Sequence, residues 1–115
     1  MKVIDLVKSL DLKIFTSEIG LNKHISGGYV SDLLSDVMGN ACEGNSWITL
    51  QNHLNVIAIA SLKDLACVIL VKGIQPSQEV IDKANTEGIA LLGSSEQTFE
   101  LAGKIYQMVH AEQLN

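Results

Sequence analysis

The sequence Trp47-Ile48-Thr49-Leu50 opens a segment, residues 47 to 93, in which apolar strand-like runs alternate with helix-like stretches. Two further runs of this kind follow, Ala66-Cys67-Val68-Ile69-Leu70-Val71 and Ile89-Ala90-Leu91-Leu92. Each run ends in a polar or glycine-bearing loop that leads into the next helix-like stretch. Strands and helices that alternate in this way build a parallel sheet. The segment therefore predicts an α/β fold.

The loops after these runs carry the polar side chains of the segment. They are Gln51-Asn52-His53-Leu54-Asn55, Lys72-Gly73-Ile74-Gln75-Pro76 and Gly93-Ser94-Ser95. Ligands of open α/β sheets sit beyond the carboxyl ends of the strands. Because parallel strands share that end, we expect all three loops to gather at one rim of the sheet.

The remaining elements are predicted from periodicity and from capping residues. We expect helices over residues 3–10, 33–41, 54–63 and 77–87, a last helix from Ser94, and further strands at 12–15 and 24–30. Asp32 or Ser31 is placed to cap the second helix, and Gly39 or Gly44 to end it. Ser77 caps the fourth helix and Gly88 ends it. The pair Gly27-Gly28 indicates a bulge or a close backbone approach.

Composition excludes several classes of protein. The net charge is −5, and all eight basic residues are lysines scattered along the chain, which argues against a nucleic-acid partner. The longest apolar run, residues 65–71, is far shorter than a membrane-spanning helix. Asp5 and Lys8 interrupt the N-terminal apolar stretch, so we expect no signal peptide. Cys42 and Cys67 lack metal-ligand spacing and indicate reduced residues of a cytoplasmic protein.

The predicted third helix, residues 54–63, is apolar on nearly every side. A helix of this kind is either deeply buried or part of a subunit interface. A domain of 115 residues has little room for a fully enclosed helix. We therefore expect a homodimer that uses this helix, which also starts inside one of the polar loops and could carry a signal from them.

His53 is the most suggestive polar side chain, since it lies in a strand-to-helix loop between Asn52 and Asn55. It is either a ligand contact or general base, or a solvent-facing residue beside an asparagine that caps the helix. Lys72 and Gly73 offer a point charge and a close backbone approach, with a solvated lysine before a turn glycine as the alternative. Ser94 and Ser95 mark an anion site at a helix start or cap their own helix.

Catalytic signatures are absent from the sequence. It contains no GxxxxGK[ST] phosphate loop, no GxGxxG, no GxSxG and no HExxH. His24 and His110 have no metal-ligand spacing to His53. We therefore expect no cofactor, no metal and no enzymatic activity, and we keep a small hydrolase or transferase with His53 as general base as the alternative.

Two stretches carry a family resemblance. They are Gly28-Tyr29-Val30-Ser31-Asp32-Leu33-Leu34-Ser35-Asp36-Val37-Met38 with Gly44-Asn45-Ser46-Trp47-Ile48-Thr49, and residues 66–80 with Gly88-Ile89-Ala90-Leu91-Leu92. In order and spacing they resemble stand-alone DRTGG-domain proteins, over nearly the whole chain. The family is related to the N-terminal domain of HPr kinase/phosphorylase, and similar domains occur in phosphotransacetylases and beside CBS domains in regulatory pyrophosphatases.

The motif that names the family is altered in this chain. Asp-Arg-Thr-Gly-Gly would fall near residues 49–55, where the sequence reads Thr-Leu-Gln-Asn-His-Leu-Asn. The arginine and the glycine pair are both replaced, and the chain also lacks the phosphate loop on which HPr kinase activity depends. With the pattern above, the resemblance predicts one three-layer α/β/α domain, residues 1–115, on a mostly parallel or mixed sheet of about five strands.

These observations predict a non-catalytic regulatory or interaction domain that binds a small anionic or nucleotide-like ligand, or a partner protein. The ligand contacts are expected at the rim and are Asp32, Asn52, His53, Lys72, Gly73, Ser94 and Ser95. The resemblance further implies an accessory role beside iron-only hydrogenase and redox-sensing systems. A purely structural dimeric adaptor is the second alternative.

Overall fold

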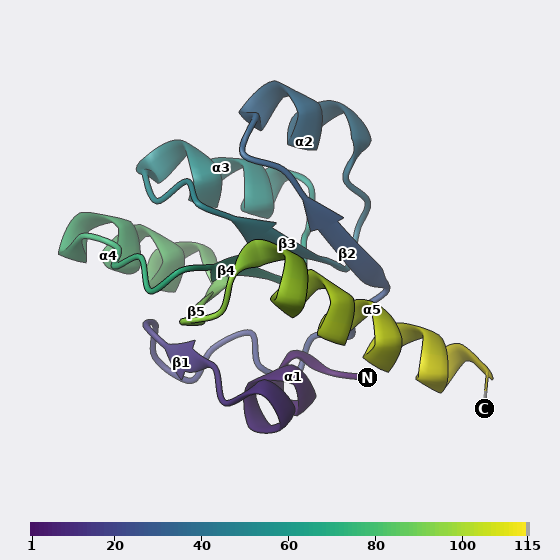
Figure 1. Ribbon diagram of the computed structural model, residues 1–115. Coiled ribbons are helices and arrows are strands. Elements are labelled where there is room, and N and C mark those ends of the chain that lie inside the picture. The colour runs from purple at the N-terminus through teal and green to yellow at the C-terminus, as the bar shows by residue number, and fades with distance from the viewer. Residues whose placement is uncertain (115) are drawn as a thin grey trace.

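The computed structural model describes residues 1–114, of which 112–114 are described by their backbone alone. Five helices and five strands are present in this part of the chain (Figure 1). In chain order they are α1 (Val3–Leu10), β1 (Lys13–Ile14), β2 (Gly27–Val30), α2 (Leu34–Asn40), β3 (Asn45–Thr49), α3 (Leu54–Leu62), β4 (Cys67–Leu70), α4 (Gln78–Glu87), β5 (Ala90–Gly93) and α5 (Thr98–Leu114).

The strands form one mixed sheet in the order β1-β5-β4-β3-β2. The strands β2, β3, β4 and β5 are parallel, and β1 joins the far edge antiparallel to β5, with Lys13 opposite Gly93. The α/β class and the mixed five-stranded sheet expected from the sequence are confirmed. The same parallel order puts the ends of β2, β3, β4 and β5 at one side of the molecule.

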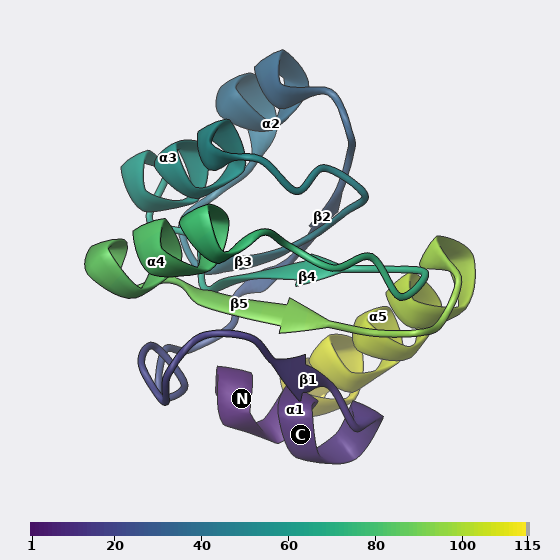
Figure 2. The same cartoon turned by 90° about the vertical axis from the view of Figure 1, so that its left-hand side faces the viewer.

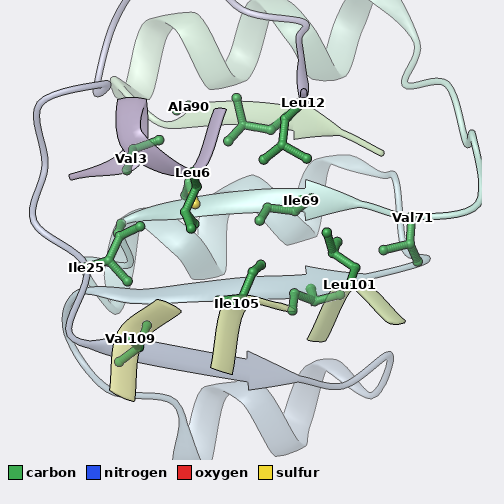
Figure 3. Packing of buried hydrophobic residues seen from close by; sticks show 14 residues of the cluster. Val3, Leu6, Leu12, Ile25, Ile69, Val71, Ala90, Leu101, Ile105 and Val109 are labelled. Carbon is green, nitrogen blue, oxygen red and sulfur yellow. The ribbon is translucent and has the colours of Figure 1, made fainter. Parts of the chain in front are cut away.

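Helices cover both faces of the sheet, as Figure 2 shows. The helices α2, α3 and α4 lie on one face, and α1 and α5 lie on the other. Side chains of a strand point alternately to the two faces, so in β4 Ile69 packs toward α5 while Val68 and Leu70 pack toward α3 and α4. Figure 3 shows the core on the α1/α5 face, where Leu101 and Ile105 of α5 lie next to Ile69 and Val109 lies nearer to Ile25.

The central strand β4 is buried at every residue, which explains its uninterrupted apolar sequence. Burial also raises the pKa of the Cys67 thiol to about 12. A thiol with so high a pKa stays protonated at neutral pH and reacts poorly. Cys67 therefore acts as a small core residue, as its position in a strand suggests.

Two details at helix starts differ from the sequence-based expectation. The last helix begins at Thr98 and not at Ser94, because Ser94 is buried and its Oγ accepts a hydrogen bond from the Glu96 amide in a separate turn. Leu33 is the first residue before α2 and provides no side-chain cap. The Ser31 hydroxyl accepts a hydrogen bond from the Leu33 amide. The Asp32 carboxylate does not cap α2, because it accepts hydrogen bonds from Thr49 and Leu50 at the end of β3.

The glycine pair Gly27-Gly28 lies inside β2, in unbroken register with Asn45 and Ser46 of β3. The strand therefore contains no bulge at this point. A β-carbon on Gly28 would lie 3.3 Å from the Ser46 hydroxyl, so the second expectation, a close approach, is the one the structure supports.

Neither Gly39 nor Gly44 ends α2, which runs through Gly39 and stops at Asn40. The expected capping of α4 by Ser77 and its termination at Gly88 are both confirmed. Across residues 1–114, every helix is too short or too polar to traverse a lipid bilayer.

Candidate functional site

The three polar loops meet at the carboxyl ends of the parallel strands, as the sequence predicts, and we call this end the rim. Backbone hydrogen bonds tie the loops together: the Gly73 amide donates to the Ser94 carbonyl and the Lys72 amide to the Glu96 carbonyl, each over 2.9 Å. The Asn52 amide group donates to the Gln75 carbonyl over 3.1 Å. The rim is therefore a connected structure, and it contains two separate depressions.

The first depression, which we call the helix hollow, has a volume of about 320 Å³. Its lining comes from the loop before α3 and from the start of α4. The lining residues are Asn52, His53, Leu54, Asn55, Ser77, Glu79 and Val80. This hollow unites two of the predicted ligand contacts, Asn52 and His53, with the α4 cap Ser77 and two residues of the first turn of α4.

Two helix N-termini face the helix hollow, because His53 and Ser77 are the residues that precede α3 and α4. The N-terminus of a helix carries partial positive charge and unpaired amide groups, which favour an anion. At α4 the Ser77 hydroxyl caps the Val80 amide and Glu79 lies in the first turn. At α3 no side chain caps the helix and its first turn carries no acidic residue. The α3 terminus is thus the more electropositive of the two.

The His53 side chain is exposed and has no hydrogen-bond partner among residues 1–114, while its carbonyl accepts from the Val56 amide. It shares the helix hollow with Ser77 and Glu79, but the Ser77 hydroxyl is engaged as the α4 cap. A general base needs a hydrogen bond, direct or through one water, to the proton it removes. His53 is therefore placed to contact a ligand, and the structure contains no pre-assembled nucleophile beside it.

The second depression, the strand hollow, has a volume of about 240 Å³ and lies where β1 pairs with β5. Its lining residues are Asp11, Lys13, Phe15, Gly73, Ile74, Gln75, Gly93, Ser94 and Ser95. Gly73, Ser94 and Ser95 are among the predicted contacts and come together here. The Lys13 ammonium group lies 5.0 Å from the centre of the Phe15 ring, so a cation stands at this hollow as well.

Lys72 and Gly73 form a tight turn in which both residues have positive φ, 60° and 72°. The glycine allows the turn, but its amide is engaged by Ser94 and the Lys72 amide by Glu96. These two amides are therefore not free to bind an anion, while Gly73 still lines the strand hollow, and the contact of both residues with a ligand stays a prediction. Lys72 is exposed and follows β4 at the rim, so its side chain can contribute a positive charge there.

Asp32 lies at the β2 end of the rim, outside both hollows. One of its carboxylate oxygens, Oδ1, accepts hydrogen bonds from the Thr49 hydroxyl over 2.9 Å and the Leu50 amide over 2.7 Å. The Gln51 side chain donates to the Asp32 carbonyl. Asp32 thus holds the β2–α2 loop to the end of β3, and its contact with a ligand stays a prediction.

Sequence reasoning missed Asp11, Lys13 and Phe15 as rim residues. They reach the rim because β1 is antiparallel to β5, which brings the start of β1 to the carboxyl end of its neighbour. The pairing of the first strand with the last joins residues far apart in the chain, and no local motif in residues 11–15 indicates it. Ser77 and Glu79 were recognisable as helix residues, but their place in the hollow depends on the packing of α4 against α3.

Outside the rim, a hydrogen-bonded pair joins β2 to α2. The Tyr29 hydroxyl donates to the Asp36 carboxylate over 2.7 Å, which lowers the pKa of Asp36 and raises that of Tyr29. In the described part of the chain, no group of three or more His, Cys, Asp or Glu residues is placed to hold a metal ion.

The fold and the rim define a small α/β domain with a polar edge that could receive a ligand. A family model, described as the DRTGG domain, matches residues 5–108. The chain belongs to the DRTGG domain family. No curated protein matches the sequence.

A solved structure shares this fold with a TM-score of 0.71 at 17% sequence identity. It contains the CBS and DRTGG domains of the regulatory region of Clostridium perfringens pyrophosphatase, complexed with the activator diadenosine tetraphosphate. The likeness covers 92% of this chain and 46% of that one, so the chain spans about half of its length. At this identity the comparison shows the fold alone.

Proposed function

We propose that this protein is a non-catalytic regulatory domain that binds a small anionic or nucleotide-like ligand at the rim. The observation that carries the proposal is the helix hollow, where the N-termini of α3 and α4 converge and α3 has neither a capping side chain nor an acidic first turn. A phosphate or carboxylate would compensate that charge. His53, Asn52 and Asn55 would then contact it.

The rest of the ligand would extend past the Gln75 carbonyl toward the strand hollow. Gln75 connects the two hollows. Its carbonyl accepts a hydrogen bond from Asn52 of the helix hollow, and the residue itself lines the strand hollow. Lys13 and Lys72 would supply positive charge, and Ser95 a hydroxyl. The nucleotide activator in the Clostridium perfringens structure supports this class of ligand.

The test is a thermal-shift screen of nucleotides, acyl phosphates and sugar phosphates. A ligand at 100 times its Kd stabilises the folded state by about 2.7 kcal/mol, which would raise Tm by roughly 10 °C for a domain of this size. A screen of all three classes without a shift would leave the structural adaptor, or a protein partner, as the function of the rim.

A charge variant localises the site once a ligand is found. Lys72→Asn removes the rim charge, and asparagine tolerates the positive φ at this position. We expect the ligand-dependent shift to shrink in this variant and in His53→Ala. Lys63→Asn and His24→Ala serve as matched controls, because Lys63 follows the opposite end of α3 and His24 precedes the start of β2. Equal losses in all four variants would contradict a specific rim site.

The alternative of a small hydrolase or transferase rests on His53, Ser77 and Glu79 sharing the helix hollow. It predicts turnover that disappears in His53→Ala while the fold persists. We favour the binding role, because Ser77 is engaged as a helix cap.

A homodimer is part of the proposal, and α3 is one surface for it. The helix buries Val56, Ile57 and Ala60 between α2, α4 and the sheet, which explains half of its apolar character. Its outer side still exposes Leu54 and Leu62. A cytoplasmic location, a relation to HPr kinase, a place beside iron-only hydrogenase systems and the single-domain extent of residues 1–115 stay predictions from the sequence.

A further inference from the structure

We infer that a second copy of this chain docks on the outer edge of β2 and the adjoining side of α5. This β2/α5 surface comprises Gly27, Gly28, Val30, Phe99, Ala102, Tyr106 and His110. The inference rests on the homodimer of the proposed function and is independent of its ligand. It moves the subunit interface from α3, where the sequence predicts it, to the opposite face of the sheet.

The two edges of the sheet differ in how they are protected. Soluble proteins guard exposed edges with short strands, charged side chains or a covering element. The β1 edge is two residues long and carries Lys13. The β2 edge is four residues long, has β3 as its one neighbour within residues 1–114, and carries no charged residue from Ser26 to Ser31. An edge strand of this length without such protection indicates that another chain or segment covers it.

An apolar groove of about 260 Å³ runs between this edge and α5. Its floor is built from the buried residues Ile48, Ile105 and Val109. Gly28 lies on the same face of β2 as Val30 and leaves the groove open because it has no side chain. Its outer wall is the Tyr106 ring, which stacks on His110 with 3.9 Å between ring centres. The groove thus has a rigid aromatic wall beside an open strand.

Two aromatic side chains on α5 project into solvent. Phe99 is 85% exposed and Tyr106 is 64% exposed, and they are the most exposed aromatic residues of the described chain. At 3.6 residues per turn they lie on one side of the helix, and the charged residues Glu100 and Lys104 lie on another. Lys104 is paired with Glu96 at the start of the helix. The stripe that continues the groove is therefore uncharged.

A two-fold axis beside β2 would make this surface complementary to itself. The two β2 strands would pair antiparallel, and the two α5 helices would lie next to each other on the same face of the joined sheet. Phe99 is about 10 Å along the helix from Tyr106. The Phe99 ring of each copy would thus reach the groove of the other.

The size of the surface is sufficient for a reversible dimer. With 17 residues α5 is about 25 Å long. Helix and adjacent strand together are about 15 Å wide, so the flat footprint is roughly 400 Å² per partner, in the size range of weak, reversible interfaces. Because each copy carries a net charge of −5, approach is most favourable across an uncharged face.

The experiment is sedimentation velocity of the full chain between roughly 5 and 200 µM, the range in which an interface at the lower size limit dissociates. We expect a monomer–dimer equilibrium for the unmodified protein. Phe99→Glu would put a charge into the apolar groove of the partner, and Tyr106→Glu would put one on the wall of that groove. Each variant should weaken Kd by at least about 30-fold. Circular dichroism should show an unchanged fold, because both side chains are exposed.

Leu62→Glu is the matched control, since Leu62 is 69% exposed and lies on α3. Retention of the dimer in Leu62→Glu and its loss in both aromatic variants would support the β2/α5 surface. Dissociation by Leu62→Glu alone would overturn this inference and return the interface to α3. A monomer at every concentration would overturn the homodimer itself, while the thermal-shift screen would still decide the ligand.

Discussion

The rim and the β2/α5 surface are both open to solvent, but they differ in how far their exposed groups are engaged within the chain. At the rim, loop amides and side chains are largely engaged with one another, as with Lys72, Gly73 and Asp32. At the β2/α5 surface, an edge strand and two aromatic rings are left without a covering element among residues 1–114. The first arrangement suits a small ligand held by a few side chains, and the second suits another protein surface.

The largest expected effect comes from Trp47, on which both regions depend. Its side chain is completely buried on the α3 face, and its indole N–H donates to the Ser31 carbonyl over 2.8 Å, just beyond β2. Trp47→Ala should lower the free energy of unfolding by about 3 to 5 kcal/mol. Urea denaturation measures the change. Trp47→Phe should cost less, and an equal cost would mean that cavity formation is not the cause.

The second effect separates a structural residue of the rim from a ligand contact. Asp32→Ala removes the acceptor for the Thr49 hydroxyl and the Leu50 amide and should cost about 1 to 2 kcal/mol of stability. Asp32→Asn keeps an oxygen at this position and should lose less. If Asp32→Asn leaves stability intact but abolishes ligand binding, Asp32 belongs to the binding site as the sequence predicts.

The third effect tests whether charge at the helix hollow governs binding. Ser77→Ala removes the α4 cap and should cost about 0.5 to 1 kcal/mol, since its hydrogen bond to the Val80 amide is long at 3.4 Å. Ser77→Asp can still cap the helix but adds negative charge to the hollow. Calorimetric titration should show weaker binding of an anionic ligand to Ser77→Asp. Unchanged affinity would place the anion elsewhere.

The fourth effect concerns the β2/α5 surface and is small in dilute solution. Phe99→Ser at an 85% exposed position should change the stability of the monomer by less than about 0.5 kcal/mol. The effect is visible in how Tm depends on protein concentration, because the Tm of a dimer rises with concentration. Differential scanning calorimetry should show that rise for the unmodified protein and a flat Tm for Phe99→Ser. A parallel rise in both would argue against Phe99 at the interface.

The smallest effect concerns the Tyr29–Asp36 pair, which fixes β2 to α2. The hydrogen bond from Tyr29 lowers the pKa of Asp36 below 3.8, so its stabilisation is present above that pH and is lost as pH falls through the lower value. Tyr29→Phe removes the bond, and the difference in unfolding free energy between pH 7 and pH 3 should become smaller. An unchanged difference would assign the acid sensitivity to other carboxylates.

The prediction of the fold from sequence succeeded where the signal is local. The buried runs at Cys67–Leu70 and Ala90–Gly93, the α4 cap at Ser77 and its end at Gly88 all lie where periodicity and capping residues indicate. It failed at Ser94, where the sequence predicts the start of the last helix. Tertiary hydrogen bonds from Gly73 and Ser94 hold that segment in a turn and delay α5 to Thr98.

By itself, the sequence determined that strands and helices alternate and that three polar loops follow parallel strands, because hydrophobic periodicity and turn chemistry act over a few residues. The tertiary structure alone decided which side chains share a hollow, that Lys13 reaches the rim, and that an apolar groove opens between β2 and α5. The first two outcomes depend on strand order and on the antiparallel pairing of β1 with β5. Such pairings are set by packing between residues far apart in the chain, which no short stretch of sequence encodes.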